Sequence, residues 1–166
     1  MNTATFSPCR QYRYTLTREV ASLDGHGVVC WVMLNPSTAT AETDDPTIRR
    51  VKAFSRAWGY RSASIVNLFA YRSTEPRRLL YVEDPVGPEN DRVIREVAGN
   101  ANAVVVAWGV HGAHRGRDAQ VLALLAAIGV SPLCLGTTRG GHPKHPLYMP
   151  AGLAPLVFQA RAAVAS

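Results

Sequence analysis

The sequence predicts an α/β protein: a three-layer α/β/α fold around a central, mainly parallel four-stranded sheet, with an N-terminal edge strand or hairpin. Two observations carry this prediction. Four short apolar runs alternate with segments of helical periodicity, which is typical of parallel sheets covered on both faces. The 166 residues, 47% of them hydrophobic, suit one folded unit, so we expect residues 1–166 to form a single domain.

The expected strands follow from the spacing of apolar residues. Polar and apolar residues alternate over 11–17, which indicates an edge strand that opens the sheet. The parallel strands are expected where apolar residues are nearly uninterrupted. These runs are residues 28–34, 64–69, 103–108 and 131–135.

Three helices are expected between these strands. Asp45 followed by Pro46 is a typical helix start, and this helix should end at Trp58, before a glycine. Residues 88–98 form the second expected helix, and the Leu- and Ala-rich segment 117–128 forms the third. Helical crossovers of this kind allow successive strands to run parallel.

The composition narrows the class of function. The net charge is +6 and all but two of the 18 basic residues are arginines, which is compatible with a partner rich in phosphate, although a GC-rich genome also yields arginine-rich proteins. Three cysteines are too few for a four-thiolate iron–sulfur cluster. No apolar run is long enough to span a membrane and no leader is recognisable, so we expect a cytoplasmic protein.

Polar or aromatic residues follow the expected parallel strands. Asn35 follows the first run, and Trp108 closes the third. Asn67 and Tyr71 belong to the second run and its end, and the fourth leads into a loop with His145. Since ligands of open α/β sheets bind beyond the carboxyl ends of the strands, we expect a site here.

The order of these motifs resembles that of the uracil-DNA glycosylase superfamily. The motifs are Met-Leu-Asn-Pro at 33–36, Asn-Leu-Phe-Ala at 67–70, Ala-Trp-Gly at 107–109 and Lys-His-Pro-Leu at 144–147. The blocks Asn-Pro-Ser-Thr at 35–38 and Asp-Pro-Thr-Ile-Arg-Arg at 45–50, with Asn-Leu-Phe-Ala, also match an uncharacterised bacterial and phage domain family over about residues 28 to 150.

The resemblance implies three catalytic residues. Asn35 would position the water that attacks the sugar, and His145 would donate a hydrogen bond to the departing base. Asp44 is a further candidate, for water activation or for reading an amino group. Glycosidic cleavage needs this kind of charge stabilisation and a positioned water rather than a strong nucleophile. Two alternatives stay open: Asp45 is a helix cap or a catalytic residue, and His142 is a second register for the motif histidine.

A base inside a duplex must be flipped out to reach such a site, then stacked and read. Asn67 offers an amide that can donate and accept, although a backbone-bridging role fits as well. Trp108, Tyr71 and Phe69 are the stacking candidates, and each could instead belong to the core.

Residues in or beside the expected strand-end loops could hold the DNA backbone. They are Ser37, Thr38, Arg49, Arg72, Arg115, Arg139, Lys144 and Pro146.

The resulting hypothesis is a monofunctional, monomeric DNA glycosylase without metal or cofactor, which leaves an abasic site. The small residues after Asn35 imply a roomy pocket, and the best-matching relatives resemble phage-defence enzymes acting on bulky modified cytosines such as glucosylated hydroxymethylcytosine in double-stranded phage DNA. Only Lys52 and Lys144 could form the Schiff base of a lyase.

Two other functions remain open. One is a metal-dependent nuclease or hydrolase that uses acidic residues and two H-x-x-H pairs. These pairs are His111 with His114 and His142 with His145. The other is a module that binds modified DNA without cleaving it, since a fold does not fix a function.

Overall fold

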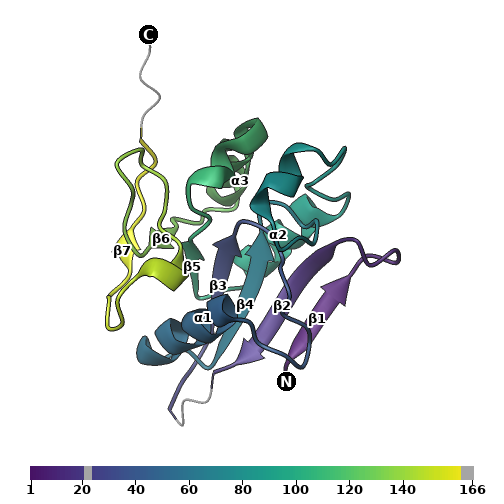
Figure 1. Cartoon of the computed structure of the whole chain (residues 1–166). Helices are drawn as coiled ribbons and strands as arrows, with labels where there is room; N and C mark the ends of the chain where they lie inside the picture. Colours follow the sequence, from purple (N-terminus) through teal and green to yellow (C-terminus); the bar gives the residue numbers. More distant parts are fainter. Residues whose placement is uncertain (21–23, 162–166) are drawn as a thin grey trace.

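The computed structural model describes residues 1–20 and 24–161 (Figure 1). Its centre is a seven-stranded mixed sheet with the order β1-β2-β4-β3-β5-β6-β7. The strands are β1 (Thr3–Phe6), β2 (Arg13–Glu19), β3 (Val28–Met33), β4 (Ser62–Asn67), β5 (Ala103–Val106), β6 (Leu133–Cys134) and β7 (Leu156–Val157). β3 is parallel to β4 and β5, and β5 is parallel to β6; the other pairings are antiparallel.

The α/β class is as the sequence predicts, and the sheet has seven strands, where the expectation was a mainly parallel set of four with an N-terminal edge strand or hairpin. The strand expected at 11–17 is β2, which is not an edge strand, because it pairs with both β1 and β4. β1 forms that edge as the first arm of a hairpin. At the other edge, β7 has only two residues, both exposed, and so carries no periodicity from which to predict it.

Helices cover both faces of the sheet. The α-helices are α1 (Pro46–Ala57), α2 (Asn90–Gly99) and α3 (Arg117–Ala127), and three short 3₁₀ helices are η1 (Pro76–Leu80), η2 (Val110–Gly116) and η3 (Pro146–Tyr148). α1 begins where the sequence predicts, because the side chain of Asp45 accepts a hydrogen bond from the backbone N–H of Ile48 over 2.8 Å. The helix expected from residue 88 begins at Asn90.

Two apolar cores lie on opposite faces of the sheet, which makes the three layers. Cys30 and Val32 of β3 pack with residues of α2 and α3. The alternate residues of the same strand, among them Val29 and Trp31, pack with α1. The ring of Trp31 stacks on Trp58 at the end of α1 with 5.5 Å between ring centroids. This alternation is the period of two expected for a strand buried on both faces.

The register of the parallel strands brings their carboxyl ends together. Met33 pairs with Asn67, and Val32 pairs with Val106. The chain beyond β6 joins the same edge, where the backbone N–H of Gly109 donates to the carbonyl of Pro143 over 2.9 Å. The loops after four strands therefore meet at one end of the sheet.

Within the described residues, no helix has the length and apolar character that a membrane crossing requires. The three cysteines are free thiols; Cys30 and Cys134 are buried, and Cys9 is exposed.

Candidate functional site

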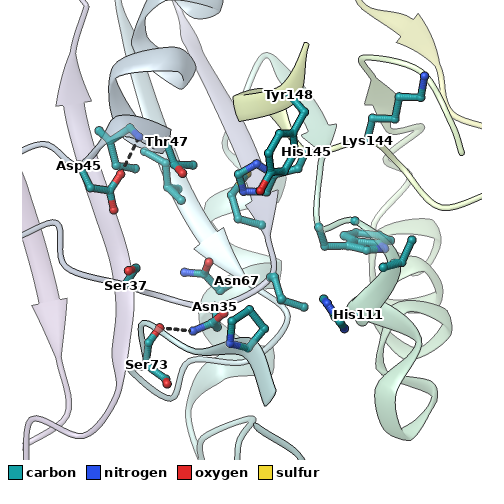
Figure 2. A pocket seen from close by; sticks show the side chains of 18 of the residues that line it. Asn35, Ser37, Asp45, Thr47, Asn67, Ser73, His111, Lys144, His145 and Tyr148 are labelled. Carbon is teal, nitrogen blue, oxygen red and sulfur yellow. Dashed lines mark hydrogen bonds between the residues drawn. The ribbon is translucent and has the colours of Figure 1, made fainter. Parts of the chain in front are cut away.

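A cleft of about 640 Å³ lies at the carboxyl ends of the parallel strands. Four of the five sequence-predicted positions at the strand ends line it, namely Asn35, Asn67, Trp108 and His145. Figure 2 shows Asn35 and Asn67 side by side, with His145 on the other side of the cleft. Residues that are far apart in the sequence thus form one site, as expected from the strand-end rule.

The side-chain amide of Asn35 has a fixed orientation. Its Nδ2 donates to the carbonyl oxygens of Ser73, over 2.8 Å, and Pro36, over 3.1 Å. Both donor hydrogens of the amide are therefore used by backbone oxygens. The oxygen Oδ1 is the end that remains for a ligand or a water molecule in the cleft.

His145 is held as a neutral hydrogen-bond donor. Its Nδ1 accepts a hydrogen bond from the backbone N–H of Leu147 over 3.2 Å, so the ring proton belongs on Nε2. Burial lowers the pKa of His145, and the negative charge of Asp45 opposes this shift only in part. The neutral ring can donate from Nε2 to a group in the cleft.

A contact with α1 holds the loop that carries His145. Pro146 is buried and opens η3, and the guanidinium of Arg50 donates to the carbonyl of Met149 at the end of that helix. His142 is not among the residues that line the cleft; its backbone N–H donates to the hydroxyl of Thr138 over 3.2 Å. Of the two registers left open by the sequence, the structure places His145 in the site.

Asp44 lies outside the cleft, which corrects its predicted place in the site. Its carboxylate contacts Nε of Arg18 over 2.6 Å and Nζ of Lys52 over 2.7 Å. Burial alone would raise the pKa of Asp44, but the hydrogen bonds from Lys52 and Arg18 outweigh it and hold the pKa below its ordinary value. Since the Arg18 side chain is fully buried, Asp44 is its counter-charge.

Asp45 occupies the position that the sequence could not assign. Oδ1 of Asp45 caps α1, so the cap interpretation is confirmed. The same residue lines the cleft, and no other acidic residue in the described ranges does so. Because the cap uses one carboxylate oxygen, the other remains available on the cleft side (Figure 2).

Asn67 and Trp108 present buried donors at the cleft. Each is only 2% exposed, and Nδ2 of Asn67 and Nε1 of Trp108 have no partner among the described residues. The Trp108 ring packs edge-on against Phe158 with 6.2 Å between centroids. A buried donor without a partner costs about 1–3 kcal/mol, which a bound ligand with matching acceptors would offset.

Phe69 and Tyr71 do not line the cleft, and their predicted stacking roles are wrong. Phe69 is fully buried in the core and lies 5.7 Å from the His114 ring. Tyr71 packs edge-on against Tyr12 of the N-terminal segment, with 6.0 Å between centroids. The segment after Asn67 returns to the cleft only at Ser73, beyond both rings.

The residues predicted to hold DNA divide into two groups. Ser37 and Lys144 line the cleft, whereas Pro146 is buried and is not among the lining residues. Five others are not among the lining residues: Thr38, Arg49, Arg72, Arg115 and Arg139. The guanidinium of Arg72 lies over the ring of Phe6, 5.0 Å from its centroid, so its loop position does not bring it to the site.

Arg13 is the main residue that sequence reasoning missed. It comes from β2, lines the cleft and is 3% exposed. Burial lowers the pKa of Arg13 to about 10, and the negative charge of Asp45 acts in the opposite direction. The signal was a basic residue within the alternating stretch 11–17, but a strand outside the parallel set is not covered by the strand-end rule.

The histidines do not gather into a metal site. His111 and His145 line the cleft, whereas His114 packs on Phe69. In the part of the chain that the structure describes, no three His, Cys, Asp or Glu side chains lie together as metal ligands would.

Comparison with known proteins gives one match. The family model described as "Protein of unknown function (DUF1643)" matches residues 13–147. No curated protein and no solved structure matches the chain.

Proposed function

The chain belongs to the DUF1643 family, whose function is unknown, and we propose that it is a monofunctional, monomeric DNA glycosylase, distantly related to the uracil-DNA glycosylases. The observation that supports this proposal is the convergence in one cleft of a fixed amide oxygen, a neutral histidine donor, a buried amide, an aromatic ring and one carboxylate. These groups belong to Asn35, His145, Asn67, Trp108 and Asp45.

The reaction needs a water molecule, a stabilised sugar and a stabilised leaving base. Oδ1 of Asn35 accepts a hydrogen bond from the water and so directs its oxygen to C1′. The bond between C1′ and the base nitrogen breaks, and its electron pair leaves with the base. Asp45 takes the proton of the water, and its negative charge stabilises the oxocarbenium-like sugar.

His145 acts on the other side of the scissile bond. Nε2–H donates to the base as negative charge develops on it, which a neutral imidazole can do when the second nitrogen is fixed. Leu147 fixes Nδ1 through its backbone N–H. A preorganised donor of this type typically contributes about 10²-fold to 10³-fold in rate.

The remaining groups suit recognition of a flipped base. The Asn67 amide offers donor and acceptor to a base edge, and the Trp108 ring offers an apolar wall. The volume of about 640 Å³ is in the range of ligand pockets and larger than a pyrimidine alone requires. We therefore keep the substrate class as a bulky modified cytosine, such as glucosylated hydroxymethylcytosine in phage DNA.

The mouth of the cleft suits a nucleic acid. Lys144 is exposed there and can approach a phosphate. Tyr148 also lines the cleft, and it is 82% exposed, so its ring can stack on a base beside the flipped one.

An abasic-site assay with chelator present tests this function. Duplex DNA would contain cytosine, uracil, hydroxymethylcytosine or glucosylated hydroxymethylcytosine, and abasic sites would be developed by heat or alkali. We expect excision from one modified DNA, reduced about 10²-fold or more by Asn35→Ala and by His145→Ala. His142→Ala is the matched control, because it alters a neighbouring loop histidine outside the cleft and should keep full activity.

Other outcomes identify the alternatives. DNA binding without abasic sites on any substrate would replace the glycosylase with a binding module. Cleavage that occurs only without chelator would replace it with a metal-dependent nuclease.

A further inference from the structure

In the described part of the chain three arginine side chains are buried, and two of them pair with an acidic side chain. Arg18 pairs with Asp44 over 2.6 Å, and Arg117 pairs with Asp91 over 2.6 Å. Arg13 is 3% exposed but makes no ion pair within 4.0 Å among the described residues. A buried charge without a partner destabilises the folded protein. The unpaired Arg13 therefore indicates a site for an anionic ligand.

The guanidinium of Arg13 is also incompletely hydrogen-bonded. Its Nη1 donates to the carbonyl of Ala39 over 2.6 Å, which holds the loop after β3. Nε is buried and has no partner among the described residues. An arginine has five donor hydrogens in a planar fork, so most of the fork remains free for an acceptor-rich group.

Asp45 does not fill the role of partner. Its charge acts on Arg13, but the two residues are too far apart for an ion pair. Oδ1 of Asp45 is bound to the backbone N–H of Ile48, where the positive end of the α1 dipole stabilises the carboxylate. One carboxylate oxygen is thus bound to the helix and the other faces the cleft without pairing with Arg13, so the charge of Arg13 is not neutralised by an ion pair.

We propose that Arg13 is the centre of an anion subsite in the cleft, which binds a phosphodiester phosphate of the nucleotide strand beside the flipped base. The planar fork of an arginine matches two oxygens of one phosphate. The hydroxyl of Ser37 lines the same cleft and can add a contact to that phosphate. The choice of a DNA phosphate rests on the proposed function, whereas the anion subsite does not.

Binding measurements on the intact protein test the subsite without relying on activity. Calorimetry would compare inorganic phosphate, deoxycytidine, deoxycytidine 5′-monophosphate and a dinucleoside phosphodiester. We expect the phosphodiester to bind about tenfold or more tighter than deoxycytidine. Arg13→Gln should remove that difference. Arg139→Gln, which alters an exposed arginine outside the cleft, should keep it.

A second readout covers the case in which Arg13→Gln does not fold. In the wild-type protein, the Nε–H resonance of Arg13 should shift when the phosphodiester is added and stay unchanged with deoxycytidine. Equal affinities for ligands with and without phosphate, or an unshifted Arg13 resonance, would overturn the subsite. A shift caused only by inorganic phosphate and the monoester would overturn the DNA assignment and indicate a free nucleotide.

The outcomes also separate this inference from the proposed function. Phosphate binding through Arg13 in a protein that makes no abasic sites would keep the subsite and remove the glycosylase. A protein that makes abasic sites while its Arg13 does not bind phosphate would keep the glycosylase and remove the subsite.

Discussion

The side-chain amide of Asn35 donates to the carbonyl oxygen of Ser73 over 2.8 Å. This bond joins the loop after β3 to the segment after β4, and it decides which end of the amide faces the cleft. An aspartate could not take this place unchanged, because a carboxylate has no hydrogen to donate.

We therefore predict that Asn35→Asp does not improve the proposed activity, although a carboxylate is a stronger base than an amide. The carboxylate would face both carbonyl oxygens. The carbonyl of Ser73 would lose its donor, whereas the carbonyl of Pro36 would keep the backbone N–H of Ser73 over 2.9 Å. We expect the free energy of unfolding to fall by about 1–3 kcal/mol, with excision no faster than in the wild type. A chemical denaturation curve and the abasic-site assay would check this, and faster excision would contradict it.

Asp44 should matter for stability and not for excision. Asp44→Asn removes the counter-charge of the buried Arg18, so we expect a loss of about 3 kcal/mol at neutral pH. Because the folded protein lowers the pKa of Asp44, its contribution is fully present above the pKa of the unfolded chain and is lost as the pH falls through the lower folded value. The difference between variant and wild type should therefore shrink in acid, while excision at neutral pH is unchanged.

Asp45→Asn should reduce excision and leave stability nearly unchanged. Asparagine is about as good an N-cap as aspartate, so the stability should stay close to that of the wild type. The variant lacks the charge that stabilises the sugar and the base that takes the proton of the water, so we expect excision to fall about 10²-fold or more. Asp45→Ala, which also removes the cap, should lose about 1 kcal/mol of stability in addition. Full activity in Asp45→Asn would limit this residue to the cap.

Most of the fold could be predicted from the sequence, because short segments encode most of its strands and helices. The apolar runs 28–34 and 103–108 predict β3 and β5, and the Asp45–Pro46 pair predicts the first residue of α1. The antiparallel strands at the edges of the sheet were harder to predict. β7 is two exposed residues whose strand conformation depends on pairing with β6, and no local pattern encodes such a pairing.

Site residues at strand ends could be predicted from the sequence. Residues whose place in the site depends on the direction of the side chain could not. Asn67 ends β4, and Asn35 and Trp108 come shortly after the ends of β3 and β5, so topology places them. Asp44 and Asp45 are adjacent, and only the rotation of the chain at the helix start turns one to Arg18 and the other to the cleft. Arg13 came from a strand that the rule for parallel sheets ignores.

His145 should titrate below the ordinary histidine pKa of about 6.5. Burial lowers its folded-state pKa, so at a pH below 6.5 the unfolded chain binds the proton more readily and the folded state loses stability. His145→Gln should remove this part of the acid destabilisation. Excision should stay constant as the pH falls through 6.5 and decrease only at the lower folded pKa, where a proton on Nδ1 would oppose the N–H of Leu147. Titration by NMR would check the shift, and a pKa above 6.5 would contradict it.

Gly112 should control the position of the Trp108 ring. A Cβ at Gly112 would lie 2.2 Å from Cδ1 of Trp108, far inside contact distance, so Gly112→Ala must move the ring or the η2 backbone. We expect a loss of about 1–3 kcal/mol in stability from overpacking and a weaker affinity for the flipped base, because the ring forms part of the apolar wall of the cleft. Ala113→Gly removes a Cβ at the neighbouring, exposed position and should leave base affinity unchanged. Tryptophan fluorescence, compared with Trp108→Phe, would report whether the ring has moved; an altered ring signal with normal affinity would remove Trp108 from base recognition.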